Sequence, residues 1–425
     1  MYEMVTGGPP FQGDTPLSVA LKKLKEAPPS PRGGAPDLPP AWEETILRCL
    51  ERAPADPFAS APEVVRALHG ETIAILGFKN LAGRPEEAWV STALSEMLTT
   101  ELAAGEKLRA ISSEDVARMK SDLSLPEADT LGRESLERVR KNIGADLVLL
   151  GSYLAMGQGP GSSVRLDLRL QDTAAGETIA VVSEKGAASD IDGLATRAGE
   201  RLREKLQLPA VSQAEAQAVR LSLPSSPEAA QLYAEGLAKL RVFDDVAARD
   251  LLEKAVALDP KHALARSALA GAWAGLGYDA KALEASKTAF ELSGNLARET
   301  RLSVEGRYRA MSNDWDRAIE IYRSLFTFYP DNLDYGLQLA GARTRAGRPG
   351  DALATIAALR RAYPKDDPRI GLAEAETSKA LSDFPRMEKA AVQAAVLAEA
   401  AGARLLAATA RLEQAIARRN LGDPK

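Results

Sequence analysis

Few side chains in this sequence could carry out acid–base, nucleophilic or metal chemistry. The 425 residues include only two histidines, His69 and His262, and a single cysteine, Cys49. A structural zinc site needs about four Cys or His ligands, and a Ser-His-Asp relay needs a histidine between its two partners. Neither arrangement can be built here, and a lone cysteine also excludes an internal disulfide framework. This cysteine usage fits a reducing compartment.

One glycine-rich stretch, Gly157 to Gly161, has the composition of a phosphate-binding loop. No helix is predicted to follow it and it lacks the lysine of a P-loop, so the sequence favours a hairpin turn. Asp167 and Glu177 stand alone on predicted solvated faces, without a second carboxylate for paired acid–base work. The sequence therefore predicts no catalytic, cofactor-binding or metal-binding residue in this chain.

Length and composition predict a multidomain globular protein. At 425 residues several domains are expected, and a net charge of -5 without a Lys/Arg-rich run gives no reason to expect nucleic acid. The stretch closest to a membrane span, Ala390 to Ala410, is interrupted by Glu399 and Arg404, so no membrane segment is predicted. No signal peptide is visible at the start, and the expected location is cytoplasmic.

The most informative pattern is a period that runs from Ser226 to Pro364. Four series of residues recur along it, and each steps by 34, 36 and 34 residues. A helix pair that cannot bury its apolar stripe alone packs it on the next pair, so this period predicts a helix-turn-helix array. An ordinary helical bundle would not keep one period in four series. The series are Gly236, Ala270, Gly306 and Ala340; Ala248, Ala282, Ala318 and Ala352; Ala255, Ala289, Leu325 and Leu359; and Pro260, Gly294, Pro330 and Pro364.

The residue types at these positions predict how each pair is built. Gly236 and Ala248 are small, as expected where the two helices of a pair come closest. Pro260 ends the second helix because proline cannot continue it. Gly277 and Gly347 are expected in the turns within pairs, where a left-handed residue is favoured.

This period and these residue types resemble the tetratricopeptide repeat (TPR) family. The resemblance implies that the first helices of the pairs line a concave groove that binds peptides or protein segments. An irregular continuation is expected after the fourth repeat, with helices over 384–400 and 403–420. The predicted repeats are 227–260, 261–294, 295–330 and 331–364, followed by the irregular segment 365–425.

Nine side chains of the first helices are expected, by register, to line that groove. Three arginines beside a tyrosine could clamp an acidic or C-terminal peptide. The alternative is that they are ordinary solvated residues of an exposed face. The predicted groove residues are Tyr233, Leu237, Arg241, Ser267, Arg307, Met311, Asp334, Leu337 and Arg345.

The first 68 residues carry three motifs in a fixed order. Residues 2–11 are Y-E-M-V-T-G-G-P-P-F, residues 46–50 are I-L-R-C-L, and residues 58–64 are F-A-S-A-P-E-V. These motifs resemble the end of the C-terminal lobe of bacterial serine/threonine protein kinases. About 68 residues of such a lobe cannot bury a proper core, so the chain is expected to be truncated at its N-terminus and this segment to lean on the next domain.

The motifs that a kinase needs for catalysis are missing from this sequence. It has no glycine-rich ATP loop, Lys–Glu pair, H-R-D loop or D-F-G magnesium site. ATP and Mg²⁺ are therefore expected only for an intact parent kinase, and this chain is expected to be inactive alone. Pro57 also stands where related kinases carry an arginine that pairs with the glutamate of A-P-E, which leaves the activity of the parent in doubt.

Residues 70–207 predict an α/β domain with one mixed sheet. The apolar runs Thr72 to Phe78 and Asp146 to Leu154 indicate buried strands, and Val164 to Leu170 alternates like a strand with one solvated face. The segment resembles the TolB-like N-terminal domain, which adds a fold more than a function. Residues 208–226 are interpreted as a linker. The resemblance rests on 74–80, the helix 94–102, 144–146 before a strand ending at 151–152, and 172–177.

Together these patterns predict a multidomain α and α/β chain: partial kinase C-lobe helices, a TolB-like α/β domain with a mixed sheet, and an all-α TPR superhelix. The predicted function is the regulatory and protein-interaction portion of a bacterial serine/threonine kinase in signal transduction, with the groove binding a protein or peptide. Two alternatives remain open. The chain is a standalone TPR adaptor with a kinase relic, or a small-molecule sensor through the TolB-like domain.

Overall fold

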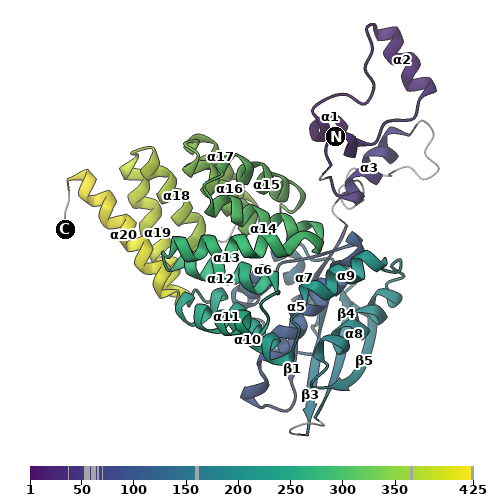
Figure 1. Ribbon diagram of the computed structural model, residues 1–425, viewed down its shortest axis with the longest axis vertical. Helices are drawn as coiled ribbons and strands as arrows, with labels where there is room; N and C mark the ends of the chain where they lie inside the picture. The colour runs from purple at the N-terminus through teal and green to yellow at the C-terminus, as the bar shows by residue number, and fades with distance from the viewer. Residues whose placement is uncertain are drawn as a thin grey trace.

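The computed structural model describes residues 1–36, 38–51, 58, 64, 67–68, 70–157, 162–330, 332–363 and 367–422. Three parts follow one another along the chain (Figure 1): an N-terminal helical segment, an α/β domain and a long array of paired helices. Pro57, Pro364 and most of the glycine-rich stretch after Gly157 lie outside the described residues.

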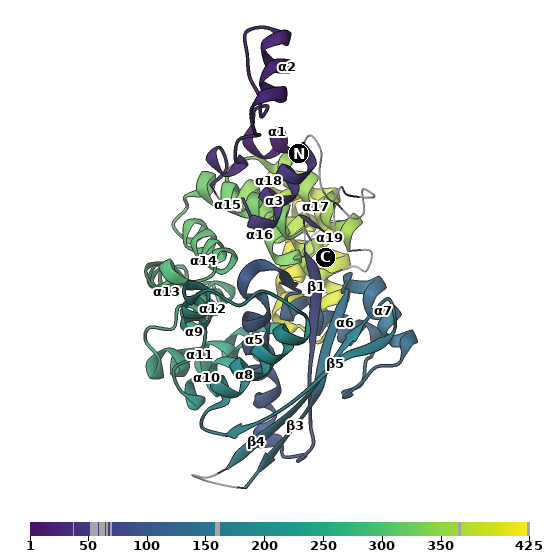
Figure 2. The same cartoon turned by 90° about the vertical axis from the view of Figure 1, so that its right-hand side faces the viewer.

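The N-terminal segment is thinly packed. Leu38 and Ile46 are buried, whereas Leu17 and Leu24 of the second helix are exposed, and that helix stands away from the rest of the chain (Figure 2). A segment this short has too little apolar surface for a core of its own. Its helices are α1 (Tyr2–Thr6), α2 (Pro16–Lys25) and α3 (Pro40–Leu50), with a 3-10 turn η1 (Pro31–Gly33).

Helix α3 leans on both of the parts that follow it. The Trp42 ring meets Phe328 of the array edge-on, with the ring centroids 5.1 Å apart. Lys107 of the α/β domain lies 3.3 Å from the Glu44 carboxylate. Side chains of α3 therefore connect the N-terminal segment to both the array and the α/β domain.

A five-stranded mixed sheet forms the centre of the α/β domain. The strand order is β2-β1-β3-β4-β5, in which β1 pairs in parallel with β2 and β3, and β3, β4 and β5 pair antiparallel. The predicted mixed sheet is confirmed, and β1, β3 and β4 extend a few residues beyond the predicted runs. The strands are β1 (Glu71–Asn80), β2 (Leu108–Ala110), β3 (Leu147–Met156), β4 (Ser163–Asp172) and β5 (Glu177–Ala187).

Helices cover both faces of this sheet. On one face α5 and α8 pack against the strands around Leu98, Leu166 and Leu194, and on the other α6 and α7 pack around Met119 and Leu136. Short 3-10 turns, η2 (Pro85–Glu87) and η3 (Ala104–Glu106), flank α5. The helices are α5 (Trp89–Ala103), α6 (Ser113–Leu123), α7 (Arg133–Ile143) and α8 (Ile191–Lys205).

The segment interpreted as a linker contains a further helix, α9 (Gln213–Ser222). It begins with a capping box in which the Ser212 hydroxyl accepts from the Glu215 backbone N–H and the Glu215 carboxylate accepts from the Ser212 N–H. Pro209 and Pro224 border this segment and favour an irregular connection. The Ser-x-x-Glu pattern between them is a helix-start signal, and the structure follows that signal.

In the part of the array that the structure describes, five antiparallel helix pairs are followed by one further helix. The pair members alternate along the chain, and the helices over 384–400 and 404–421 closely match those predicted for the irregular continuation. The pairs are α10 (Pro227–Arg241) with α11 (Asp245–Leu258), α12 (Ala263–Gly275) with α13 (Asp279–Leu292), α14 (Arg298–Met311) with α15 (Trp315–Phe328), α16 (Leu333–Arg345) with α17 (Pro349–Ala362), and α18 (Pro368–Ala380) with α19 (Phe384–Ala400), followed by α20 (Arg404–Leu421); η4 (Ser293–Asn295) joins the second and third pairs.

Close helix approach explains the small residues of the repeat. A Cβ atom at Gly236 would lie 2.7 Å from Leu252 Cγ, and one at Gly306 would lie 2.9 Å from Tyr322 Cε1. Neither distance leaves room for a larger side chain. Gly277 and Gly347 have φ values of 78° and 72°, the left-handed conformation predicted for the turns.

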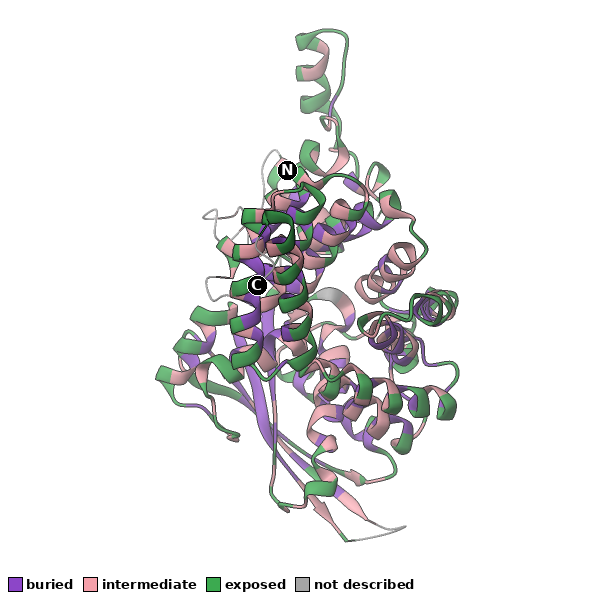
Figure 3. Cartoon of the chain, turned by 90° about the vertical axis from the view of Figure 1, so that its left-hand side faces the viewer, coloured by how far each residue is buried: buried purple, intermediate pink, exposed green. Residues whose placement is uncertain are grey.

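The array shares a core with the α/β domain at its first helix. Ala230 and Ala234 of α10 are buried in the same apolar cluster as Leu98 of α5 and Leu166 of β4. From there the array curves away from the sheet and returns toward α6 (Figure 2), and Figure 3 shows the curved array from the opposite side. Phe243, in the turn after α10, packs against the turn between α19 and α20, so the first and last pairs meet.

Candidate functional site

A large cavity lies between the concave face of the array and the α/β domain. Its volume is about 1180 Å³. One wall is made by α10, α12, α14 and α16, which are the first helices of the first four pairs, and the other by α5, β2, α9 and the start of α6. Trp42 of α3 also reaches this wall, so all three parts of the chain line one space.

Five of the nine predicted groove residues line the cavity, and four do not. Met311 packs beside Trp273 in the core between the first two pairs, and Leu337 packs on the α17 side of its own pair. Arg345 lies over the Trp315 ring, 5.6 Å from its centroid. The five residues that line the cavity are Tyr233, Leu237, Ser267, Arg307 and Asp334.

Arg241 is the fourth predicted residue outside the cavity lining, because the α/β domain already neutralises it. Its guanidinium contacts the Glu96 carboxylate of α5 and lies 3.7 Å from the Glu114 carboxylate of α6. Burial alone would lower the pKa of Arg241, but these two carboxylates raise it above its ordinary value. Arg241, which was predicted to bind an acidic peptide, therefore pairs with acidic side chains of its own chain.

Arg307 differs from Arg241, because within the described part of the chain it makes no ion pair or hydrogen bond. It lies against Gly271 of α12, where a Cβ atom would collide with its guanidinium. Tyr233 and Tyr322 are its neighbours, and burial raises the pKa of both phenols while the Arg307 charge opposes the shift. A positive charge without a counter-ion thus lines the cavity.

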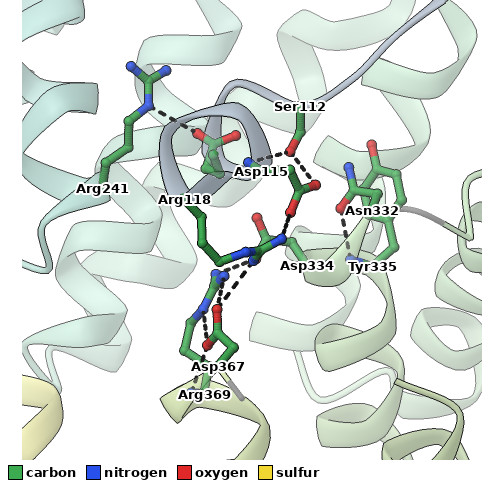
Figure 4. A network of polar contacts seen from close by, with 10 residues as sticks. Ser112, Asp115, Arg118, Arg241, Asn332, Asp334, Tyr335, Asp367 and Arg369 are labelled. Atoms are coloured by element: carbon green, nitrogen blue, oxygen red, sulfur yellow. Dashed lines mark hydrogen bonds and ion pairs between the residues drawn. The ribbon is translucent and has the colours of Figure 1, made fainter. Parts of the chain in front are cut away.

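A chain of alternating charges joins α6 to the fourth and fifth pairs (Figure 4). Arg118 of α6 contacts Asp115 of its own helix and donates to Asp367 across a distance of 3.2 Å. Arg369 in turn lies 3.0 Å from Asp367 and 2.6 Å from Asp334. Three carboxylates and two guanidinium groups thereby alternate in sign across the boundary between the two domains.

Local contacts fix the ends of this network. The Ser112 hydroxyl caps α6 by accepting from the Asp115 N–H, and it donates to the Asp115 carboxylate at 2.6 Å. Asp367 caps α18 by accepting from the Arg369 N–H at 2.9 Å. Burial alone would raise the pKa of Asp367, but Arg369 and Arg118 hold it below its ordinary value. Both caps preorganise the carboxylates for the charges that they meet.

Glu114 lies where α6, α10 and α16 converge. Burial raises the pKa of its carboxyl to about 7, Arg241 opposes the shift, and Glu96 and Asp334 add to it. A carboxyl with this pKa exchanges its proton near neutral pH. The corner of the cavity beside Arg241 therefore changes charge within the physiological range.

Sequence reasoning did not find Arg118, Asp367 or Arg369. Arg118 and Asp367 are separated by 249 residues, and no period relates a helix of the α/β domain to the array. The usable signals are local, since Ser112 and Asp367 both occupy positions that favour helix caps.

The described ranges hold no cluster of three or more His, Cys, Asp or Glu side chains that could bind a metal ion. His262 is buried in the wall behind Tyr233, and its Nε2 lies 3.0 Å from the Ser222 carbonyl oxygen of α9. Burial lowers the pKa of this imidazole. No helix in the part of the chain that the structure describes is long and apolar enough to cross a bilayer.

A family model described as tetratricopeptide repeat matches residues 310–377. The match begins at the end of α14 and reaches into α18, so it covers the part of the array that carries Asp334, Asp367 and Arg369. The array therefore contains a tetratricopeptide repeat, a fold that generally mediates protein–protein interaction.

Serine/threonine-protein kinases are similar to a short part of the chain. A probable serine/threonine-protein kinase of Clostridium acetobutylicum is 40% identical over 68 residues, which are 16% of this chain and 10% of the kinase. The serine/threonine-protein kinase PknA of Mycobacterium tuberculosis is 46% identical over 72 residues, 16% of each chain. The chain thus spans between 10% and 16% of the length of these relatives.

Among solved structures, a tetratricopeptide repeat protein from Parabacteroides merdae has a TM-score of 0.32 and 13% identity to this chain. The overlap covers 52% of this chain and 81% of that protein.

Proposed function

We propose that this chain is the regulatory and partner-binding part of a bacterial serine/threonine protein kinase, and that a protein segment binds in the cavity. The similarity to a serine/threonine kinase over 68 residues supports the regulatory role in a kinase. The segment that carries the three kinase motifs is also 68 residues long. In this proposal the parent enzyme uses ATP and Mg²⁺ to phosphorylate proteins, and this chain holds no cofactor. The α/β domain is proposed to be TolB-like.

Arg307 is the observation that carries the partner-binding proposal. A guanidinium beside a cavity, with no carboxylate partner among the described residues, favours a ligand that brings a negative group. Tyr233 and Ser267 lie on the same wall and add hydroxyl groups for hydrogen bonding. We therefore propose that the partner places a carboxylate, from a side chain or a free C-terminus, on Arg307.

The size of the cavity favours a protein segment over a small molecule. A volume of about 1180 Å³ exceeds the range of roughly 300–1,000 Å³ that is usual for small-molecule pockets. The hollow beside Gly77 and Lys120 within the α/β domain measures about 20 Å³, which is room for about one water molecule. The cavity dimensions thus favour the interaction role over the sensor alternative.

Peptide binding to the full chain tests this proposal. Three sets of short, labelled random peptides are compared by fluorescence polarisation: one with a central aspartate and an amidated end, one without acidic residues but with a free C-terminal carboxylate, and one with neither. We expect one of the first two sets to bind, and Arg307→Gln to weaken that binding about tenfold, the loss of one charge-assisted hydrogen bond.

The matched control is Arg323→Gln, which removes an exposed arginine from α15. It should leave binding unchanged. Equal binding of all three sets, or equal affinities of the Arg307 and Arg323 variants, would contradict the proposal. The first two sets also distinguish a side-chain carboxylate from a C-terminal one.

A further inference from the structure

Besides the ion pairs of Arg241 with Glu96 and Glu114, two contacts between the described parts of the array and the α/β domain differ in chemistry. At the first, Ala230 and Ala234 of α10 are buried with α5 in one continuous apolar cluster. At the second, α6 meets α16 and α18 through the alternating charges of Asp115, Arg118 and Asp367 and their neighbours. Burial of apolar surface is not reversed by salt or by a competing charge, whereas an ionic contact is open to both.

The ionic contact holds one guanidinium on the array in a defined site. Arg118 reaches across from α6, donates to Asp367 Oδ2 at 3.2 Å, and lies over the Tyr363 ring at 5.2 Å from its centroid. The Asp367 side chain is 6% exposed and the Arg118 side chain 24% exposed. A carboxylate that pairs with a planar cation and an aromatic ring that the cation lies over form a site that fits arginine.

We propose that Asp367 and Tyr363 form an arginine-binding subsite on the array, that Arg118 fills it in the closed state, and that a partner segment opens the cavity by placing its own arginine there. In this arrangement the apolar contact between α5 and α10 is a fixed hinge, and the α6 contact is a releasable latch. The inference rests on the proposed function, because the latch controls entry to the cavity around Arg307.

Two features support displacement at this site. Asp367 remains fixed when Arg118 leaves, because it also accepts from the Arg369 backbone N–H and pairs with the Arg369 guanidinium. Among the described residues, Phe243 also packs on the α19–α20 turn, and its half-buried ring lies 5.8 Å from Arg369. The site is therefore preformed, and this half-buried ring adds only a small apolar contact to those that oppose opening.

The vacated surface also defines the chemistry of the partner. Asp334 and Asp367 together carry one more negative charge than Arg369 balances, so this end of the concave face favours a basic residue. Arg307, further along the same face, favours an acidic one. The fitting partner is a segment with an arginine and a carboxylate, placed so that each reaches its counterpart.

Accessibility of the cavity tests the latch without any partner. In the full chain with the exposed Cys49 replaced by serine, Gln338→Cys places a single thiol on an exposed position of the cavity wall. The rate of its reaction with a large polyethylene-glycol maleimide is divided by its rate with iodoacetamide. The small reagent enters in both states, so the ratio reports opening.

We expect Arg118→Glu and Asp367→Asn each to raise this ratio about tenfold, the effect of losing one hydrogen bond between charged groups. Asparagine retains the helix cap of α18, so Asp367→Asn removes the charge alone. Raising the salt to about 1 M should raise the ratio of the parent protein as well. Arg197→Glu, at a partly exposed arginine of α8 that pairs with Asp190 of its own domain, is the matched control and should have no effect.

A ratio that stays at the parent value in both latch variants, with circular dichroism unchanged, would overturn the proposal. So would a parent protein that reacts with the large reagent as fast as with the small one. A synthetic peptide of residues 111–124 then tests the subsite directly: it should bind the Arg118→Glu chain in trans and lose affinity when its own arginine is replaced by alanine. Because the accessibility assay needs no carboxylate ligand, failure at Arg307 and failure of the latch are distinguishable.

Discussion

Arg307 and Arg369 belong to the concave face of the same array, yet they are in opposite electrostatic situations. Arg369 lies between Asp334 and Asp367, and these carboxylates raise its pKa although burial opposes the shift. Arg307 has no carboxylate partner among the described residues. One arginine is therefore neutralised by carboxylates of the fold, while the other has no such partner in the described part of the chain. Residue type and helical register alone do not distinguish the two cases.

The difference arises from what the α/β domain and the array supply to each arginine. Glu96 and Glu114 come to Arg241 from α5 and α6, and Arg369 shares Asp367 with Arg118 of α6. The residues of α5 and α9 that line the cavity are mostly small and uncharged, with Glu96 and Glu215 as the charged exceptions. Charged side chains of the α/β domain thus contact the concave face near Arg241 and Arg369. None of those described pairs with Arg307.

Among the variants that test this comparison, removal of Arg369 should have the largest effect on the free energy of unfolding. Arg369→Ala leaves Asp334, Asp367 and Asp115 close together with only Arg118 to balance them, and we expect the array to lose about 3 kcal/mol of unfolding free energy. Urea unfolding followed by circular dichroism measures the change. Arg361→Ala, an exposed arginine of α17, is the control. Equal effects of the two variants would show that the charge network contributes nothing.

A smaller effect is expected from the titration of Glu114. Its folded-state pKa of about 7 lies above the ordinary 4.5, so the folded chain binds this proton more tightly than the unfolded chain. The stability that it contributes is fully present below about pH 4.5 and is lost as the pH rises through about 7.

Glu114→Gln should abolish this slope. Relative to the variant, the parent protein should lose about 1 kcal/mol between about pH 5 and about pH 8, a figure reduced for solvent screening of a half-exposed group. Thermal unfolding of both proteins across this range measures the difference. The opposite slope of buried His262 is common to both proteins and cancels. Parallel pH profiles would contradict the raised pKa.

The smallest effect on stability is expected at Arg307. Arg307→Gln removes a side chain that has no counter-ion among the described residues, so the free energy of unfolding should change by no more than about 0.5 kcal/mol. The same urea titration measures it. A loss approaching that of Arg369→Ala would mean that Arg307 stabilises the fold, and the comparison between the two arginines would fail.

Periodic features were predictable from the sequence, and contacts between domains were not. Gly236, Gly277 and Gly306 predicted helix approach and turns because the requirement for a small or left-handed residue is local. The period then placed Tyr233, Ser267 and Arg307 on the first helices that line the cavity. These steps need only the geometry of one helix pair.

The remaining features depend on how the domains meet. Arg241 was predicted as a clamp residue, but its partners Glu96 and Glu114 come from another domain, which no pattern within the array indicates. Met311, at the end of α14, and Leu337, in the middle of α16, pack into apolar clusters with neighbouring helices. They therefore do not line the cavity. Register gives the face of a helix, and tertiary packing decides which part of that face is covered.

The contact between Trp42 and Phe328 has a mechanical consequence. Phe328 ends α15, at the bend between the third and fourth pairs, and Trp42 also borders the cavity. A change in the superhelical pitch of the array at this bend displaces α3 with it. The position of α3 is thus coupled to the curvature of the array through the contact between Trp42 and Phe328.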